Sequence, residues 1–205
     1  MTAEELLQCY AAGERDFEGI EIARDRDIKG GSYTSTDLSG VNLSGANFRN
    51  AALNYINLER VNLEGANLSQ AGLYKTSLVR ANLRAANLEK SSVECTNFSY
   101  ANLVAASLRK ASGKGAYFGA NLTQSDLRKA DLTQSRFDGA VLRRANLTEA
   151  LLNEVTLFRV DLREAIGASL DSSKYFATIL PNGTIVSTLS DGSIASIPNF
   201  GPLFS

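Results

Sequence analysis

Residues 81–90 read ANLRAANLEK, and this stretch contains the pattern that decides the fold. It divides into two units of five residues, each with Ala first, Asn second and Leu third. The period continues on both sides, because all fifteen positions spaced five apart from Leu38 to Leu108 are apolar. After a shift of phase, all nine such positions from Leu122 to Leu162 are apolar as well. Self-similarity at a fixed period is the signature of a repeat architecture.

A period of five fits neither regular secondary structure. On a helix, a step of five residues advances by about 140° modulo a turn, so the leucines would be distributed over all faces of the helix. On a strand they would alternate between the two faces. The large side chains stay buried together only if the chain turns a corner in every repeat and winds around a central axis. The residue two before each Leu, most often Ala, then also points inward, where little volume remains.

The pattern A-(N/D)-L-x-x resembles that of the pentapeptide-repeat family, and the resemblance covers residues 14–170. Residues 6–17 are similar to the lead-in of many cyanobacterial members. The resemblance implies an all-β fold, a right-handed quadrilateral parallel β-helix with four repeats per coil. Residues twenty apart agree in type, as four repeats per coil require. Three such columns are Leu43, Leu63, Leu83 and Leu103; Ala46, Ala66, Ala86 and Ala106; and Asn42, Asn62, Asn82 and Asn102. We expect the asparagines to form hydrogen-bonded ladders between coils.

Both ends of the chain are expected to cap the solenoid, whose terminal coils would otherwise expose apolar cores and free edges. Residues 1–13 predict a capping helix that begins with a Thr2/Glu5 capping box. After the β-helix of residues 14–170, residues 171–205 predict a hairpin and an irregular tail. The hairpin strands are 175–180 and 185–189, joined by an Asn-Gly turn, and a short third strand follows.

Two interruptions of the repeat are visible. About one residue is expected to be inserted near Asp25–Asp27, because Phe17 and Ile22 follow a different phase from the later repeats. A second register break falls at 111–119, which holds three glycines and leaves the repeat one residue short. We expect a distorted coil or a loop there, and the residues leave open whether the loop protrudes or the coil tightens. Within it, Gly113-Lys-Gly115 lacks the rest of a phosphate-binding loop and predicts a surface loop.

Composition argues against an enzyme. The 205 residues include 21 Lys+Arg and 22 Asp+Glu, so the formal net charge is −1, and there is no His. Without His, neither a Ser–His or Cys–His nucleophile pair nor a His-ligated metal site can form. We therefore expect no catalytic, cofactor-binding or metal-binding residues. The two cysteines, Cys9 and Cys95, are expected to be free thiols because several coils separate them. The acidic N-terminus is unlike a signal peptide and no apolar run is long enough to span a membrane, so a cytoplasmic location is expected.

Charge is distributed unevenly along the chain. Residues 1–37 carry four basic and nine acidic residues, which gives −5, whereas residues 38–170 carry sixteen and eleven, which gives +5. Arg60 and Arg80 are twenty apart and should stack on neighbouring coils, with Arg84 on the next repeat. This corner is the candidate partner-binding site, and the alternative is a solvated face. The aromatics Tyr55, Tyr74, Tyr100 and Phe158 either contact a partner or pack across the flat faces.

The sequence is compatible with two functions. The first is a non-catalytic scaffold whose flat faces bind another protein. By analogy with cyanobacterial members of the family that act in cell differentiation, such a scaffold would have a regulatory role. The second, implied by the family resemblance, is a DNA mimic that inhibits or protects a type II topoisomerase. A mimic needs stacked acidic residues, but Glu59, Glu64 and Glu89 each have non-acidic residues twenty positions before and after them. No nucleic acid or membrane partner is expected, and the sequence identifies neither the partner protein nor the oligomeric state.

Overall fold

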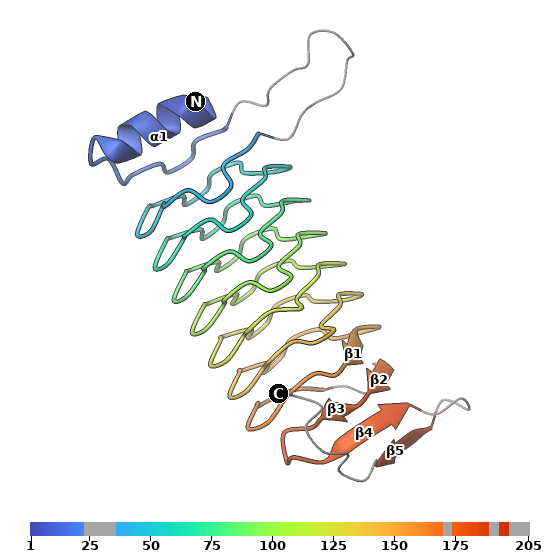
Figure 1. Ribbon diagram of the computed structural model, residues 1–205. Helices are drawn as coiled ribbons and strands as arrows, with labels where there is room; N and C mark the ends of the chain where they lie inside the picture. Colours follow the sequence, from blue (N-terminus) through green and yellow to red (C-terminus); the bar gives the residue numbers. More distant parts are fainter. Residues whose placement is uncertain (23–35, 170–173, 189–192, 197–205) are drawn as a thin grey trace, which may run out of the picture.

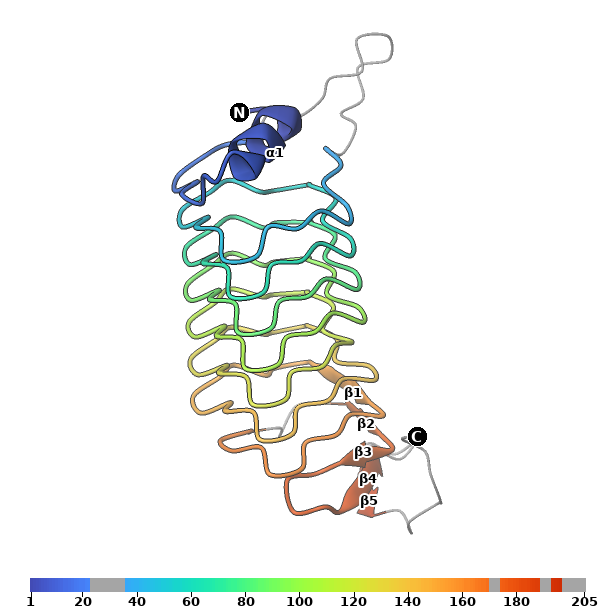
Figure 2. The same ribbon diagram turned by 60° about the vertical axis from the view of Figure 1, so that its left-hand side comes forward.

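The computed structural model describes residues 1–22, 36–169, 174–188 and 193–196. The chain forms a rod of stacked coils, with helix α1 (Ala3–Ala11) at one end and a small antiparallel sheet at the other (Figures 1 and 2). Parallel bridges join residues twenty apart, such as Asn62 and Asn82, so four pentapeptides make one coil. The fold is the right-handed quadrilateral β-helix that the family resemblance implies.

Each repeat ends in a tight turn. In the repeat of Leu83, the Ala86 N–H donates to the Leu83 carbonyl oxygen at 3.0 Å, and Ala85 has a φ of 54°. A positive φ at the third residue of a four-residue turn is the mark of type II geometry, which favours Gly. Most turns here have another residue at this position, at a cost of about 1–2 kcal/mol each. Stacking offsets this cost, because the Ala85 N–H also donates to the Val104 carbonyl oxygen of the next coil at 2.9 Å.

The central apolar residues fill the inside of the rod. All 24 of them are buried, at 5% exposure or less. Phe98, Phe118 and Phe137 form a stack with ring centroids 5.1 Å apart. The residues two before each centre are buried too, apart from the half-buried Val41, and where one is Thr its hydroxyl needs a partner. Thr76 and Thr96 donate to the carbonyl oxygens of leucines on the preceding coil at 2.6 Å.

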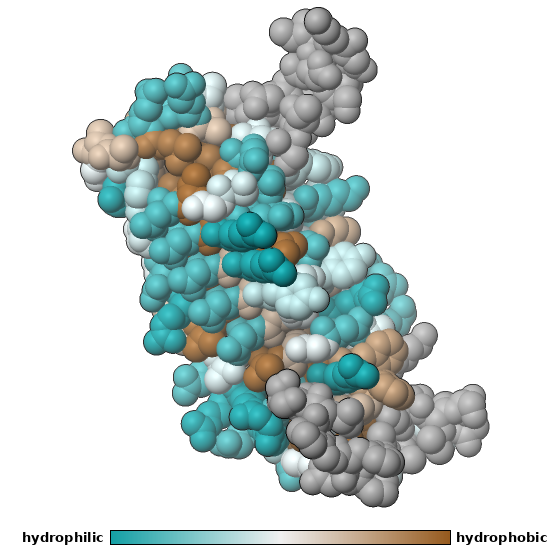
Figure 3. All heavy atoms as spheres, in the orientation of Figure 1, coloured by the Kyte–Doolittle hydropathy of each residue, from teal (hydrophilic) through white to brown (hydrophobic). Residues whose placement is uncertain are grey.

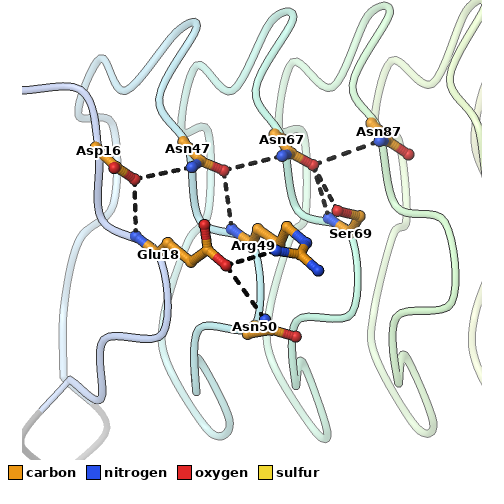
Figure 4. Close-up of polar contacts among 8 residues, drawn as sticks. All are labelled: Asp16, Glu18, Asn47, Arg49, Asn50, Asn67, Ser69 and Asn87. Carbon is orange, nitrogen blue, oxygen red and sulfur yellow. Dashed lines mark hydrogen bonds and ion pairs between the residues drawn. The ribbon is translucent and has the colours of Figure 1, made fainter.

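Asparagine ladders run along the outside of the rod, as predicted. The Asn67 amide donates to the Asn47 Oδ1 at 2.9 Å, and the Asn87 amide donates to the Asn67 Oδ1 at 3.4 Å (Figure 4). Each Oδ1 also accepts from the N–H two residues later, at Arg49 and Ser69. One side chain therefore joins two coils and fixes the following turn.

The N-terminal cap contains the predicted capping box. The Glu5 N–H donates to the Thr2 hydroxyl at 3.1 Å, and the Thr2 N–H donates to the Glu5 carboxylate at 2.8 Å. Leu6 is fully buried against the core. The predicted insertion near Asp25–Asp27 lies outside the described residues. Asp16 bridges Asn47, 31 residues away, which is eleven more than the usual spacing of twenty and corresponds to two repeats and the one residue of the predicted phase shift.

Of the two alternatives left open for residues 111–119, the structure shows the tightened coil, and the surface loop predicted at Gly113–Gly115 is wrong. Gly113 occupies a central position and is buried, and a Cβ there would lie 3.0 Å from the Leu132 Cδ2. Neighbouring side chains thus use the space that a Leu would fill. The missing residue is in one turn, after Phe118, where the Ala120 N–H donates to the Phe118 carbonyl oxygen at 2.6 Å. Bridges beyond it, starting with Asn102 to Asn121, first span nineteen residues.

The C-terminal strands continue the coil and then cover it. The predicted strand 175–180 divides at Ala177, whose φ is 47°. Its first part pairs in parallel with the preceding coil, and its second part begins the predicted hairpin. The predicted third strand is present, and residues 197–205 lie outside the described part of the chain. The strands are β1 (Thr156–Phe158), β2 (Lys174–Phe176), β3 (Thr178–Ile179), β4 (Ile185–Thr188) and β5 (Ile194–Ser196).

Candidate interaction surface

One side of the rod, together with its turn edge, gathers exposed arginines and aromatic rings. It is the side whose inner wall carries the phenylalanine stack, and β1 forms its C-terminal end. We call it the arginine–aromatic face. Its members are Arg60, Arg80, Tyr100, Tyr117, Arg136, Phe158 and Arg159.

The turns place Arg60 and Arg80 on neighbouring coils, as the sequence predicts. The Arg60 N–H donates to the Val79 carbonyl oxygen at 2.9 Å, which sets the two turns in register. Both side chains are exposed, and neither makes an ion pair within the described residues. Like charges stacked one coil apart repel each other. An anionic group of a partner would relieve this repulsion.

Arg84 does not belong to this edge. It lies on the next turn of the same coil, and its guanidinium is 3.7 Å from the Glu64 carboxylate on the coil before. The predicted three-arginine corner is therefore two stacked arginines and a separate ion pair. Exposed ion pairs contribute little, about 0.2–1 kcal/mol, but this one leaves Arg84 with a carboxylate already beside it.

Aromatic rings continue the edge beyond Arg80. Tyr100 is 76% exposed, with the Arg80 guanidinium 5.9 Å from its ring centroid, a distance at which a cation–π attraction acts. Phe158 is 39% exposed and packs edge-on against Phe176. On another edge, Tyr55 and Tyr74 pack edge-to-face at 5.4 Å. Tyr100 is thus the most exposed of the four aromatics that the sequence analysis named.

Sequence reasoning missed three members of the face, Tyr117, Arg136 and Arg159. Tyr117 and Arg136 lie where Asn usually stands, and they bridge each other across neighbouring coils. The Arg136 guanidinium is 5.6 Å from the Tyr117 ring centroid and donates to the Asp138 carboxylate at 2.8 Å. The hydrogen bonds to Asp138 raise the pKa of the Arg136 guanidinium, which is charged at neutral pH as every arginine is. The repeat pattern contains a signal for both, namely departure from Asn, but the register break hides the alignment of Arg136 with Tyr117, which is nineteen residues before it.

A notch opens in the face at the shortened turn. Its volume is ≈ 180 Å³, and its lining consists of Ser99, Tyr117, Gly119, Arg136 and Asp138. Gly119 is required here, because a Cβ would lie 2.9 Å from the Asp138 carbonyl oxygen. With one turn residue missing, the edge recedes for one coil between Tyr100 and Gly139.

Acidic side chains elsewhere on the rod lie beside basic or polar ones. The Lys129 ammonium is 3.2 Å from the Glu149 carboxylate, and Gln134 donates to Glu154 at 3.0 Å. Arg144 donates to Glu164 and lowers the pKa of that carboxyl. Asp161 is buried between two arginines, Arg143 at 2.6 Å and Arg163 at 2.7 Å. In the view of Figure 3 the side of the rod is mainly hydrophilic, with hydrophobic residues in small separate areas.

The described residues contain no group of three His, Cys, Asp or Glu side chains that could hold a metal ion. Cys9 and Cys95 are free thiols, as predicted. No helix in the part of the chain that the structure describes is long and apolar enough to cross a membrane. The described residues thus form a repeat solenoid, and its most distinctive feature is the arginine–aromatic face.

The family follows from the repeat. The model for pentapeptide repeats (8 copies) matches residues 34–65, 42–78, 76–112, 94–137 and 118–157, more than half of the chain. The chain belongs to the pentapeptide-repeat family. Among curated protein sequences, none matches it significantly.

Several solved structures are similar to this chain. HetL, a pentapeptide repeat protein involved in heterocyst differentiation regulation from the cyanobacterium Nostoc sp. strain PCC 7120, is 26% identical, with a TM-score of 0.28. That match covers 90% of this chain and 99% of HetL. Rfr23 from the cyanobacterium Cyanothece 51142 is 21% identical over 84% of this chain and 98% of its own, with a TM-score of 0.22. Trypsin-treated QnrB1, a plasmid-mediated fluoroquinolone resistance protein, is 18% identical, with a TM-score of 0.43. That match covers 78% of this chain and 89% of the QnrB1 chain.

Proposed function

We propose that this protein is a non-catalytic scaffold that binds another protein through its arginine–aromatic face. The observation that carries the proposal is the position of Arg60 and Arg80, two exposed arginines on neighbouring turns that make no ion pair within the described residues, with the exposed Tyr100 beside Arg80. Arg and Tyr are the side chains enriched at the energetic centres of protein interfaces. A partner that supplies carboxylates and covers Tyr100 would gain from both groups.

The β-helix supports this role because it presents the face in a fixed shape. Backbone hydrogen bonds of 2.9 Å tie the turns of Arg60 and Arg80 to the coils after them. A surface of this kind loses little conformational entropy when it binds, so more of the contact energy becomes affinity. We further propose a regulatory role in the cytoplasm, by analogy with HetL, whose description concerns the regulation of differentiation.

The alternative is a DNA mimic that inhibits or protects a type II topoisomerase. It would need carboxylates stacked along the rod in place of phosphates. Within the described residues, the column of Glu64 continues with Arg84, and Lys129 directly precedes Glu149 in its column. The strongest unpaired charges on the arginine–aromatic face are positive. The distribution of charge therefore favours the scaffold.

The test is capture from the native cytoplasm with quantitative mass spectrometry. The bait is the full chain, compared with an Arg60→Glu/Arg80→Glu double variant. The matched control is Arg109→Glu/Lys110→Glu, which reverses two charges on a different turn. The proposal requires a protein that is captured by the wild-type and control baits and is depleted with the Arg60/Arg80 variant. Equal capture by all three folded baits would refute it.

A further inference from the structure

The notch beside Gly119 results from the deletion of one turn residue and leaves the core unchanged. Phe118 stays in the phenylalanine stack, 5.1 Å from each neighbouring ring. The Tyr100 N–H still donates to the Gly119 carbonyl oxygen, at 2.7 Å. The coil therefore keeps its interior while its edge recedes. A recess of this kind can receive a side chain from outside without any movement of the rod.

The walls of the notch fit a flat ring. The lining includes Tyr117, which is 43% exposed, together with the small residues Ser99 and Gly119. The volume of ≈ 180 Å³ suffices for the ring of a Phe or Tyr. Aromatic rings prefer offset or edge-to-face contact at centroid distances of about 4.5–7 Å, a geometry that Tyr117 offers to an incoming ring.

The charge of the notch itself is already balanced. The Asp138 carboxylate accepts from Arg136 at 2.8 Å and from the Thr156 hydroxyl at 3.0 Å. Unbalanced positive charge lies farther along the edge, on Arg80 in one direction and Arg159 in the other. Both are exposed, and neither makes an ion pair within the described residues.

The two arginines are equally far from the notch along the axis. The turn of Arg80 is two coils before that of Gly119, and the turn of Arg159 is two coils after it. At about 4.8 Å per coil, each lies roughly 10 Å away along the rod. An extended peptide covers that distance in about three residues, at roughly 3.3 Å per residue. The spacing matches an aromatic residue with an acidic residue three positions to either side.

We propose that the notch and its flanking arginines bind an extended acidic segment of a partner protein. The segment lies along the axis of the rod, with an aromatic side chain in the notch and carboxylates at Arg80 and Arg159. This inference rests on the proposed function and specifies the chemistry of the partner. A single-stranded nucleic acid fits less well, because its phosphates would meet the Asp138 carboxylate and its successive bases would need successive aromatic platforms.

The experiment is a fluorescence-anisotropy titration of a labelled synthetic peptide with the full chain. The peptide has a central Tyr, a Glu three residues to either side, and Ser or Gly elsewhere. Saturable binding is expected, and it should weaken by about fivefold or more with Arg80→Glu and with Arg159→Glu, since each change removes an attraction and adds a repulsion. Arg109→Glu, on another turn, should change binding by less than about twofold.

Two further variants test the notch. Insertion of an Ala after Gly119 restores the five-residue repeat and should fill the recess, and Ser99→Tyr should fill it from the neighbouring coil without a change in chain length. At least one of these two variants should fold, as judged by circular dichroism. In that variant the central Tyr of the peptide should no longer contribute to binding. A peptide with Gly in place of Tyr should then bind wild type and variant equally.

Three results would overturn the proposal. They are the absence of saturable binding, equal binding of a peptide whose two Glu residues are adjacent, and tighter binding of a single-stranded oligonucleotide of the same length. The proposed function fails separately, because it depends on capture of a cellular protein that is sensitive to Arg60 and Arg80. If the cellular protein is captured as predicted but the synthetic peptide does not bind, the proposed function stands and only the proposed chemistry of the bound segment is wrong.

Discussion

Replacement of Leu83 by Ala should strongly destabilise the protein. Leu83 is fully buried, and the backbone bonds of its column, from the Leu63 N–H to Asn82 and from the Leu83 N–H to Asn102, are both 2.8 Å. The substitution removes three carbon atoms from the core, worth about 2.4 kcal/mol at roughly 0.8 kcal/mol each. The ladders above and below hold the walls apart, so a cavity term adds to this. We expect a total loss of about 3–5 kcal/mol.

Urea denaturation followed by circular dichroism measures the loss, with two matched variants as controls. Arg84→Ala changes the adjacent exposed residue and should alter the free energy of unfolding by no more than about 0.5 kcal/mol. Ala86→Leu adds bulk at a position only 1% exposed and should cost about 1–3 kcal/mol by overpacking. If Arg84→Ala were as destabilising as Leu83→Ala, the assignment of inward and outward positions would be wrong.

Three other predictions concern the turns, the thiols and the charges. Gly65 and Ala85 occupy the same turn position on neighbouring coils, with φ values of 64° and 54°. Gly65→Ala should therefore lower the free energy of unfolding by about 1 kcal/mol and Ala85→Gly should not lower it, as thermal unfolding would show. Quantitative labelling of the unfolded protein under non-oxidising conditions should detect two thiols, Cys9 and Cys95, and a lower count would contradict their separation. The protein should leave DNA supercoiling by gyrase unchanged at low micromolar concentration, because its carboxylates form no stacked row in the described coils, and inhibition there would revive the DNA-mimic alternative.

The sequence predicts the interior of the rod because the turn in every repeat leaves one arrangement for a period of five. Leu83 points inward, Arg84 outward, and Asn82 forms the ladder with Asn62 at 3.0 Å. Each position thus has one physical role, which its residue type reveals. The capping box at Thr2 and the hairpin around Gly183 are equally local and follow from the residues themselves.

Irregular features are harder to predict because the periodic pattern does not distinguish between equivalent neighbours. Phe17 and Ile28 are both apolar, and either could precede Phe48 in its column. The structure stacks Phe17 on Phe48, with ring centroids 5.4 Å apart, while Ile28 lies outside the described residues. The glycine-rich composition around Gly113 indicates a loop. In the structure, side chains of neighbouring coils occupy the space that a larger residue at position 113 would need.

The candidate site shows the same limit. The stacking of Arg60 and Arg80 follows from their spacing of twenty residues. The separation of Arg84 does not, because closeness in sequence says nothing about which edge of the coil a residue occupies. Arg136 aligns with Tyr117 only after the one-residue deletion is located, since that deletion changes the spacing of these two neighbours from twenty to nineteen.

The most direct test of the arginine–aromatic face is site-specific photo-crosslinking in the native cells. A photoreactive phenylalanine analogue replaces Tyr100 in one variant and Gln70 in another. Both positions are exposed turn residues with a φ of 61°, but Gln70 lies on a different edge of the rod. The account predicts a defined crosslinked protein with the analogue at position 100 that is lost when Arg60 and Arg80 are reversed. Crosslinks to the same proteins with equal yield from position 70 would contradict it.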